Sequence, residues 1–389
     1  MIGVVKKLAW RVFLQPCDVF LGRLPCRFCS EMLEKMMFFR QKTKKIGTCH
    51  GFPAVTCAGL SKKPDFFDSP ATVAAMKGGA GMSLSEKTKK WLKKTGCASL
   101  RGKTVIVTGA GSGIGYKTAE VAVFLGASVI MACRNLKKAG GAADELRREY
   151  PGSNVKVMSL DLADLSSVDA FADRIVSEKI DVDIFVNNAG VFRHPGRKTK
   201  DGFELVIGTN YIGVFRLTGK LVGYLSSLPH PVYYMNTVSV VFRTARKIDF
   251  GDFYFEKRYS DLAAYSRSKL CLAIFSRALA RSLSDTNLAV YMIHPGVSMT
   301  PLAADAYGRV VSFLANRFRG LFNSPEKSSL APFFILAKQP PAGSLAGPSG
   351  FFGVWGYPKT NSIPKRIDRG GEELIAFTEN ELSGINTVE

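Results

Sequence analysis

The chain has 389 residues, of which 46% are hydrophobic and 22% are charged, with 53 Lys and Arg against 32 Asp and Glu. This composition is too apolar for a disordered chain and lacks the glycine or proline period of a fibre, so it predicts a globular protein. The net charge of +21 is concentrated in residues 1–100, which carry +12, and no DNA-reading motif accompanies it. We therefore expect no nucleic-acid partner.

Residues 1–81 form an N-terminal extension that is poor in acidic residues and holds five of the eight cysteines. Three interpretations stay open for it. The first is a membrane-surface anchor or transit peptide, because basic and apolar residues alternate. The second is a zinc site, although the spacing lacks a second close pair, and its ligands would be Cys26, Cys29, Cys49, His50 and Cys57. The third, which we favour, is that the extension is not a folded part of the protein and that the functional chain begins near Met82.

The expected elements begin with a capped short helix at Ser83-Leu-Ser-Glu86 and the lysines that follow. From residue 103 onward, short apolar runs alternate with helix-length segments, which is typical of buried parallel strands with helical crossovers. The expected strands are 104–107, 127–132, 155–160, 184–186, 232–236 and 288–293. The fold class is therefore α/β: a doubly wound parallel sheet of the Rossmann type with three α/β/α layers over residues 82–360, followed by a tail at 361–389. Ligands of such folds bind at the carboxyl ends of the strands.

A glycine-rich loop, Thr108-Gly-Ala-Gly-Ser-Gly-Ile-Gly115, follows the first expected strand and leads into a helix. Glycines permit the tight turn and the close approach of a pyrophosphate, and the N–H groups of the helix start face its negative charge. A glycine cluster alone would fit an ordinary turn, but the strand before it and the helix after it predict a dinucleotide site.

The second strand ends at Ala132-Cys-Arg134-Asn135, with Lys137 and Lys138 close behind. An acidic residue here would favour the free ribose hydroxyl of NAD, whereas arginine can bind the 2′-phosphate of NADP. We therefore expect NADP(H) as the preferred cofactor, with NAD(H) as the alternative. Arg134 could instead be a solvated cation at a helix start.

Tyr265 and Lys269 are four residues apart on an expected helix, which places them on one face. An ammonium group near a phenol lowers the phenol pKa from its usual value near 10, so that the tyrosine can exchange a proton with an alcohol or carbonyl while hydride moves to or from nicotinamide. Such a pair on its own is usually a surface pair. Its position after a glycine loop favours catalysis.

With these motifs, the sequence resembles the short-chain dehydrogenase/reductase family, and within it the branch of retinol dehydrogenases and similar microsomal oxidoreductases. The resemblance covers roughly residues 100–340. Beside the glycine loop and the Tyr265–Lys269 pair, it rests on Asn187-Asn-Ala-Gly190, His294-Pro-Gly-Val297, Ala132-Cys-Arg134, Arg197–Phe203 and Glu256–Ser260.

The resemblance implies the roles of individual residues. The catalytic residues would be Asn210, which holds a water in a proton relay, Ser239, which binds the substrate oxygen, Tyr265, the acid/base, and Lys269, which also binds ribose. The cofactor-binding residues would be Gly109, Ser112, Gly113, Ile114 and Gly115 at the pyrophosphate, Arg134 at the 2′-phosphate, Asp161 and Leu162 beside the adenine, Asn188 on the adenosine side, and Pro295, Gly296, Val297 and Thr300 at the nicotinamide end, together with Ala189, Gly190, Tyr265 and Lys269. Two of these have structural alternatives, since Asp161 could form a turn and Asn210 could stabilise a helix irregularity.

The end of the fifth strand departs from the family pattern. The family commonly carries two serines there, but this chain reads Asn236-Thr-Val-Ser239-Val240. Alignment on Asn236 puts Ser239 in the catalytic place, whereas counting back from Tyr265 without a gap puts Val240 there. A slip of one residue turns a strand side chain to the opposite face. We expect Ser239, with one residue inserted within 241–246.

Residues 309–322 alternate bulky apolar side chains with arginines, as expected of a substrate lid, a membrane-surface helix or a core-facing helix. Residues 339–358, rich in Pro and Gly, read as loop and edge structure. The sequence thus predicts an NADP(H)-dependent oxidoreductase for an alcohol or carbonyl of an apolar, retinal-, lipid- or steroid-like substrate. The alternatives are reduction of a C=C bond, as in protochlorophyllide reductases, and a catalytically weak cofactor sensor. We expect no metal site and a cytoplasmic location. Peripheral contact with a membrane and formation of a homodimer both stay open.

Overall fold

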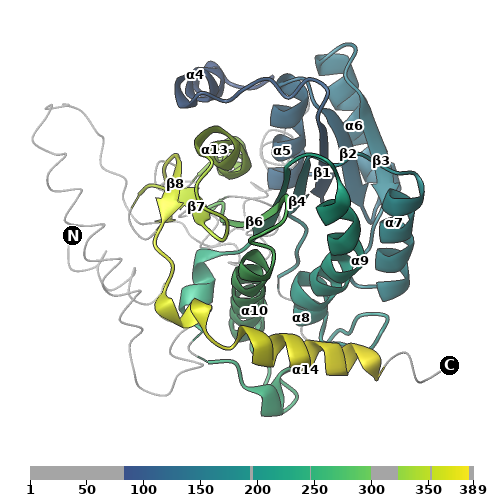
Figure 1. Ribbon diagram of the computed structural model, residues 1–389, viewed down its shortest axis with the longest axis vertical. Coiled ribbons are helices and arrows are strands. Elements are labelled where there is room, and N and C mark those ends of the chain that lie inside the picture. Colours follow the sequence, from purple (N-terminus) through teal and green to yellow (C-terminus); the bar gives the residue numbers. More distant parts are fainter. Residues whose placement is uncertain (1–82, 193–195, 246, 299–322, 351–352, 385–389) are drawn as a thin grey trace, which may run out of the picture. The chain divides into compact units, whose positions relative to one another are not determined.

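A single twisted sheet forms the centre of the compact unit of residues 74–389 in the computed structural model (Figure 1). The structure describes residues 83–192, 196–245, 247–298, 323–350 and 353–384, all within the compact unit of residues 74–389. The eight strands lie in the order β3-β2-β1-β4-β5-β6-β7-β8. They are β1 (Thr104–Thr108), β2 (Ser128–Cys133), β3 (Val155–Ser159), β4 (Ile184–Asn187), β5 (Val232–Thr237), β6 (Leu288–Ile293), β7 (Leu345–Pro348) and β8 (Pro358–Asn361). Strands β1 to β7 pair in parallel and β8 is antiparallel to β7.

Helices connect the strands and cover both faces of the sheet (Figure 1). The helices are α4 (Glu86–Thr95), α5 (Gly113–Phe124), α6 (Leu136–Glu149), α7 (Leu165–Ser177), α8 (Leu205–Ile207), α9 (Gly213–Ser227), α10 (Asp261–Ser282), α12 (Pro325–Ser328), α13 (Ala331–Lys338) and α14 (Gly371–Ser383). Short turns of other helix types are η1 (Gly208–Ile212), η2 (Val240–Arg243), η3 (Phe250–Asp252) and η6 (Lys365–Asp368). The predicted doubly wound parallel sheet with three layers is confirmed, and all six expected strands are present.

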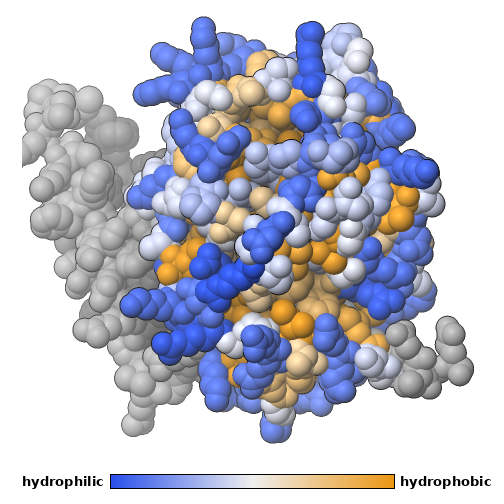
Figure 2. Space-filling view, in the orientation of Figure 1, coloured by the Kyte–Doolittle hydropathy of each residue, from blue (hydrophilic) through white to orange (hydrophobic). Residues whose placement is uncertain are grey.

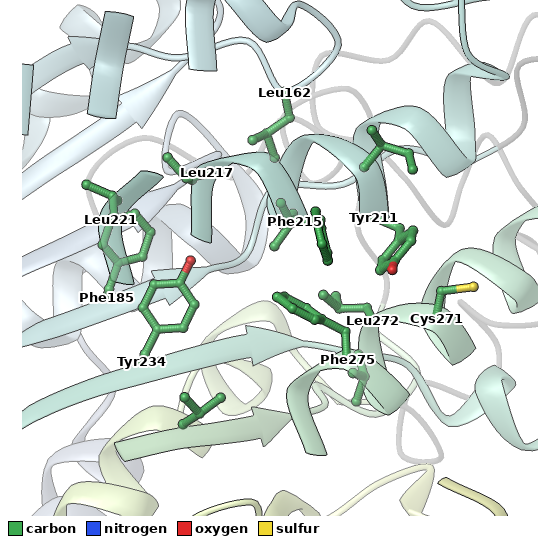
Figure 3. Close-up of a cluster of buried hydrophobic side chains, with 14 of the residues drawn as sticks. Leu162, Phe185, Tyr211, Phe215, Leu217, Leu221, Tyr234, Cys271, Leu272 and Phe275 are labelled. Atoms are coloured by element: carbon green, nitrogen blue, oxygen red, sulfur yellow. The ribbon is translucent and has the colours of Figure 1, made fainter. Parts of the chain in front are cut away.

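Each face of the sheet packs against its own apolar core. One core joins the sheet to α4, α5, α6 and α13, and the other joins it to α7, α9, α10 and α14. In the second core, the ring of Phe215 on α9 lies 4.9 Å from that of Phe275 on α10, and Tyr211 of η1 packs beside both (Figure 3). This aromatic contact holds η1 and α9 against α10, the helix that carries Tyr265 and Lys269.

The segment 361–389, which the sequence analysis treats as a tail, includes the helix α14, which packs on α10. The hydroxyl groups of Thr378 and Tyr211 lie 2.7 Å apart, and Tyr254 Oη donates to Glu381 at 2.8 Å. Arg277 pairs with Asp368 at 2.7 Å just before the helix. These buried and half-buried bonds attach η6 and α14 to the core.

At the other end of the described chain, α4 packs on elements that come much later in the sequence. Its N-cap, Ser85, accepts a hydrogen bond from Thr88 N and donates one to Glu326 Oε1 at 2.6 Å. The ring of Trp91 stacks on that of Tyr357 at 5.6 Å. The opposite face of α4 carries exposed lysines, which belong to the hydrophilic area at the top of Figure 2. The three interpretations of residues 1–81 concern residues outside those the structure describes.

Candidate active site

A narrow crevice lies at the carboxyl ends of β4, β5 and β6, where the glycine loop meets α12 and α13. Its lining residues are Ile114, Thr118, Val186, Asn188, Thr237, Ile293, His294, Pro295, Ser328, Ala331 and Pro332. This is the edge of the sheet at which ligands of doubly wound folds bind. Of the predicted cofactor-binding residues, it brings together Ile114, Asn188 and Pro295.

The glycine loop packs closely against the residues that follow β4. Gly109 has a φ of +67°, and a Cβ there would lie 2.9 Å from Ala189 Cα. A Cβ on Gly115 would lie 2.5 Å from both Asn188 Nδ2 and Gly109 O. Side chains cannot occupy these places without backbone movement, so only glycine lets the loop pack this closely against Ala189 and Asn188.

Within the described residues, Ser112, the N-cap of α5, makes no side-chain hydrogen bond to the helix. The N–H groups of the first turn are therefore not capped by that hydroxyl. Instead, Lys138 Nζ donates to Ser112 Oγ at 3.0 Å. A cation therefore lies beside the end of the helix that attracts anions.

Asn188 links β1 to β4. Its Nδ2 donates to Thr108 O at 2.9 Å, and Thr108 Oγ1 accepts hydrogen bonds from the N–H groups of Asn188 and Ala189 at 3.0 and 2.9 Å. These three bonds fix the backbone beside the glycine loop, while Asn188 still lines the crevice.

At the expected adenosine end, Arg134 has 67% of its side chain exposed and lies 3.8 Å from Asp161. Asp161 Oδ1 accepts a hydrogen bond from Ala163 N at 3.0 Å, which makes it a turn-forming residue as well. The side chain of Leu162 is 4% exposed and belongs to the core. Of Asp161 and Leu162, Asp161 therefore has the side chain that is more accessible to a ligand.

Lys269 is buried beside Tyr265 on α10. Its Nζ lies 5.9 Å from the centre of the Tyr265 ring and donates to Thr237 O at 2.8 Å. Burial lowers the pKa of Lys269 from 10.5 to about 8. The Tyr265 ring is half-buried and makes an edge contact with Phe192 at 4.9 Å. The predicted tyrosine–lysine pair is therefore assembled.

Asn210 lies in η1, a π-helical turn, and is fully buried. Its Oδ1 accepts from Val191 N at 2.7 Å, and its Nδ2 donates to Val191 O at 2.9 Å and to Ser268 Oγ at 3.1 Å. A Cβ on Gly190 would lie 3.0 Å from Asn210 Oδ1 and 3.5 Å from Lys269 Nζ. Asn210 and Lys269 thus meet around Gly190, a position that only glycine fits comfortably. Such π-turns are frequent at functional sites.

Ser239 is half-buried and caps η2, where its Oγ accepts from Val241 N at 3.5 Å. The neighbouring Val240 side chain is 8% exposed. The turn η2 packs on α10. Of these two residues, Ser239 is the one whose side chain is more accessible to a molecule entering from solvent.

The strand β6 is followed by a turn, Pro295–Val297, for which the sequence predicted contact with nicotinamide. Gly296 has a φ of +78°, and its N–H donates to His294 Nδ1 at 3.1 Å. The predicted contact of Thr300 and the lid expected at 309–322 lie outside the described residues.

Two crevice residues that the sequence did not single out carry buried polar atoms. Thr237 Oγ1 and Ser328 Oγ have no hydrogen-bond partner within the described part of the chain. Buried hydroxyl groups are normally hydrogen-bonded, so both fit a site that a polar ligand completes. Thr237 directly follows the expected strand 232–236, which is a usable signal, whereas Ser328 is distant in sequence and only the fold brings it here.

The described residues hold no cluster of His, Cys, Asp or Glu suited to a metal ion. No helix in the described ranges is long and apolar enough to span a bilayer. The glycine cradle, the loop Thr108–Gly115 before α5, has an N-cap side chain that makes no bond to the helix, and this cradle and the two unpartnered hydroxyl groups fit a dinucleotide.

The fold and this crevice define a Rossmann-type dinucleotide-binding protein, and comparison with known proteins makes the class specific. Residues 103–229 match the family model described as short chain dehydrogenase. Retinol dehydrogenase 13 of Homo sapiens is 39% identical over 247 residues, which cover 62% of this chain and 70% of that protein. Retinol dehydrogenase 14 of Homo sapiens is 42% identical over 52% of this chain and 64% of that protein.

Among solved structures, an uncharacterized protein from Mycobacterium paratuberculosis is 33% identical with a TM-score of 0.57, covering 73% of this chain and 94% of its own. An oxidoreductase from E. coli, at 22% identity and a TM-score of 0.51, shares the fold. The chain belongs to the short-chain dehydrogenase/reductase family, whose members are NAD(P)-binding oxidoreductases, and is similar to retinol dehydrogenases.

Proposed function

We propose that this protein transfers a hydride between NADP(H) and an alcohol or carbonyl of an apolar substrate. The observation that carries the proposal is the buried Lys269 beside the half-buried Tyr265, at the strand edge that also holds the glycine cradle. Bound nicotinamide supplies or accepts the hydride at the carbon that reacts.

The residues of the chain handle the proton. In the direction of reduction, Tyr265 Oη donates its proton to the carbonyl oxygen while hydride adds to the carbonyl carbon, which yields the alcohol. The charge of Lys269 stabilises the negative charge that forms on the phenol oxygen, and the effect is strong because the group is buried. Ser239 donates a hydrogen bond to the same substrate oxygen.

Asn210 contributes through its backbone. Both amide hydrogens and the side-chain oxygen of Asn210 are bonded to Val191 and Ser268. A relay water therefore has to be held by a main-chain carbonyl of the π-turn, whose shape the Asn210 side chain maintains.

The preference for NADP(H) rests on two cations at the expected adenosine end. Arg134 is mostly exposed and its distance of 3.8 Å from Asp161 indicates a weak pair, so a 2′-phosphate can compete for it. Lys138 adds a second positive charge beside Ser112. The apolar substrate class is supported by the names of the similar proteins, the retinol dehydrogenases.

The test is oxidation of NADPH and of NADH by the full chain against a panel of apolar aldehydes and ketones, with product analysis. We expect alcohol formation with a preference for NADPH. A saturated C–C bond in the product of a conjugated ketone would identify the C=C reductase. Cofactor binding without turnover on any panel member would favour the sensor.

A further inference from the structure

The turn Pro295–Val297 at the crevice has a tightly determined backbone. A Cβ on Gly296 would lie 2.5 Å from Val354 O, and Val297 N donates to the same carbonyl oxygen at 2.9 Å. His294, which accepts the Gly296 N–H, is 3% exposed, and burial lowers its pKa to about 3. The ring is therefore neutral near pH 7, with its proton on Nε2. On the side that faces Val354 and His294, the turn therefore has little conformational freedom.

On the other side, one amide side chain bonds both the turn and the loop that supports it. Asn323 is 2% exposed. Its Nδ2 donates to Pro295 O at 3.3 Å and to Gly356 O at 3.2 Å, and its Oδ1 accepts from Gly356 N at 3.0 Å. Its backbone N–H donates to Val297 O at 3.0 Å. Asn323 thus binds the first and last residues of the turn at once.

We propose that Asn323 is a positioning residue for the nicotinamide end of the cofactor; this inference rests on the proposed function. Asn323 holds Pro295, which lines the crevice, at a fixed distance from the loop around Gly356. Only an amide supplies two donors and an acceptor at one carbon. With the turn fixed before binding, the cofactor does not have to order it.

The decisive variant is Asn323→Asp, which keeps the size and the acceptor but removes both side-chain donors. A matched control lies at the other end of β6, the strand that leads into the turn Pro295–Val297. Asn287 precedes β6, and its Nδ2 donates to the carbonyl oxygens of Leu225, Leu228 and His230 at 3.2, 2.9 and 2.7 Å. Asn287→Asp therefore removes comparable bonds far from the crevice.

Binding of two ligands is compared by fluorescence titration: NADPH, and ADP-ribose 2′-phosphate, which lacks nicotinamide. We expect Asn323→Asp to weaken NADPH binding by about fivefold or more, because loss of one buried hydrogen bond typically changes a dissociation constant by about that factor. Binding of the fragment should stay within about twofold. Asn287→Asp should lower the melting temperature without changing the ratio of the two dissociation constants. An equal loss for both ligands, or no loss, overturns the inference.

A measurement on the unmodified chain covers the case in which Asn323→Asp does not fold. Hydrogen exchange should show that NADPH slows exchange in residues 296–298 and 353–356 together, since Asn323 bonds both. Protection of the first segment alone contradicts the inference. Failure of the wild-type chain to bind either NADPH or NADH would instead refute the proposed function.

Discussion

Replacement of Lys269 by methionine should make the protein more stable while it abolishes turnover. The pKa of Lys269 changes from 10.5 to about 8 because the ammonium group is buried. At 1.36 kcal/mol per pKa unit, this corresponds to a penalty of about 3 kcal/mol for the charge at pH 7. Loss of the hydrogen bond to Thr237 O offsets about 1 kcal/mol of it. We therefore expect Lys269→Met to raise the free energy of unfolding by about 2 kcal/mol.

The sign of this effect predicts its pH dependence. The folded pKa of Lys269 lies below the unfolded one, so the unfolded chain binds more protons between pH 8 and 10.5 and the wild-type protein becomes more stable there. The advantage of Lys269→Met should therefore shrink as the pH rises through that range. Urea unfolding at pH 7 and at pH 10 measures it, with the exposed Lys359→Met as control. A less stable variant at pH 7, or a difference independent of pH, refutes the reasoning.

Three further predictions concern the glycine loop, the cofactor and a surface histidine. Gly115→Ala should weaken NADPH binding about tenfold or more, because its Cβ would lie 2.5 Å from Gly109 O. The control is Gly111→Ala, whose Cβ would meet Ala139 at an ordinary 3.7 Å and which should bind NADPH normally in the same titration. Arg134→Ala should raise the KM for NADPH and leave that for NADH nearly unchanged; equal effects on both would contradict the phosphate assignment. A hydrogen bond to Asp181 raises the pKa of His230. His230→Gln should therefore be less stable than the wild type below about pH 6.5, and this difference in melting temperature should fade as the pH rises through the raised pKa. A difference in melting temperature that grows with pH would contradict this.

The strands were predictable because each is a short apolar run between helix-length segments, and a parallel strand covered on both faces has to be apolar. The four-residue strand β7 lies within residues 339–358, which were expected only as loop and edge structure because they are rich in proline and glycine. The strand β8 begins at the last of these residues, Pro358, and was not expected as a strand. No local signal in the sequence indicates the pairing of β7 with β8. The helix α14 escaped notice because its acidic, polar surface resembles that of a solvated tail.

The candidate site likewise contains some residues that the sequence predicted and others that it did not. Tyr265 and Lys269 follow from a helical spacing of four, and the glycine loop follows from its place between a strand and a helix. Only the tertiary fold brings Ser328 to the crevice and Asn323 to Pro295 at its edge, so no local pattern marks them.

The most direct test of the proposed mechanism is turnover by Tyr265→Phe compared with Tyr224→Phe, whose hydroxyl donates to Ile180 O in another part of the protein. With an aldehyde that the wild-type chain reduces, we predict that Tyr265→Phe binds NADPH normally but loses at least about 100-fold in kcat, as expected for removal of a general acid, while Tyr224→Phe keeps full activity. A Tyr265→Phe protein that turns over like the wild type would contradict the account.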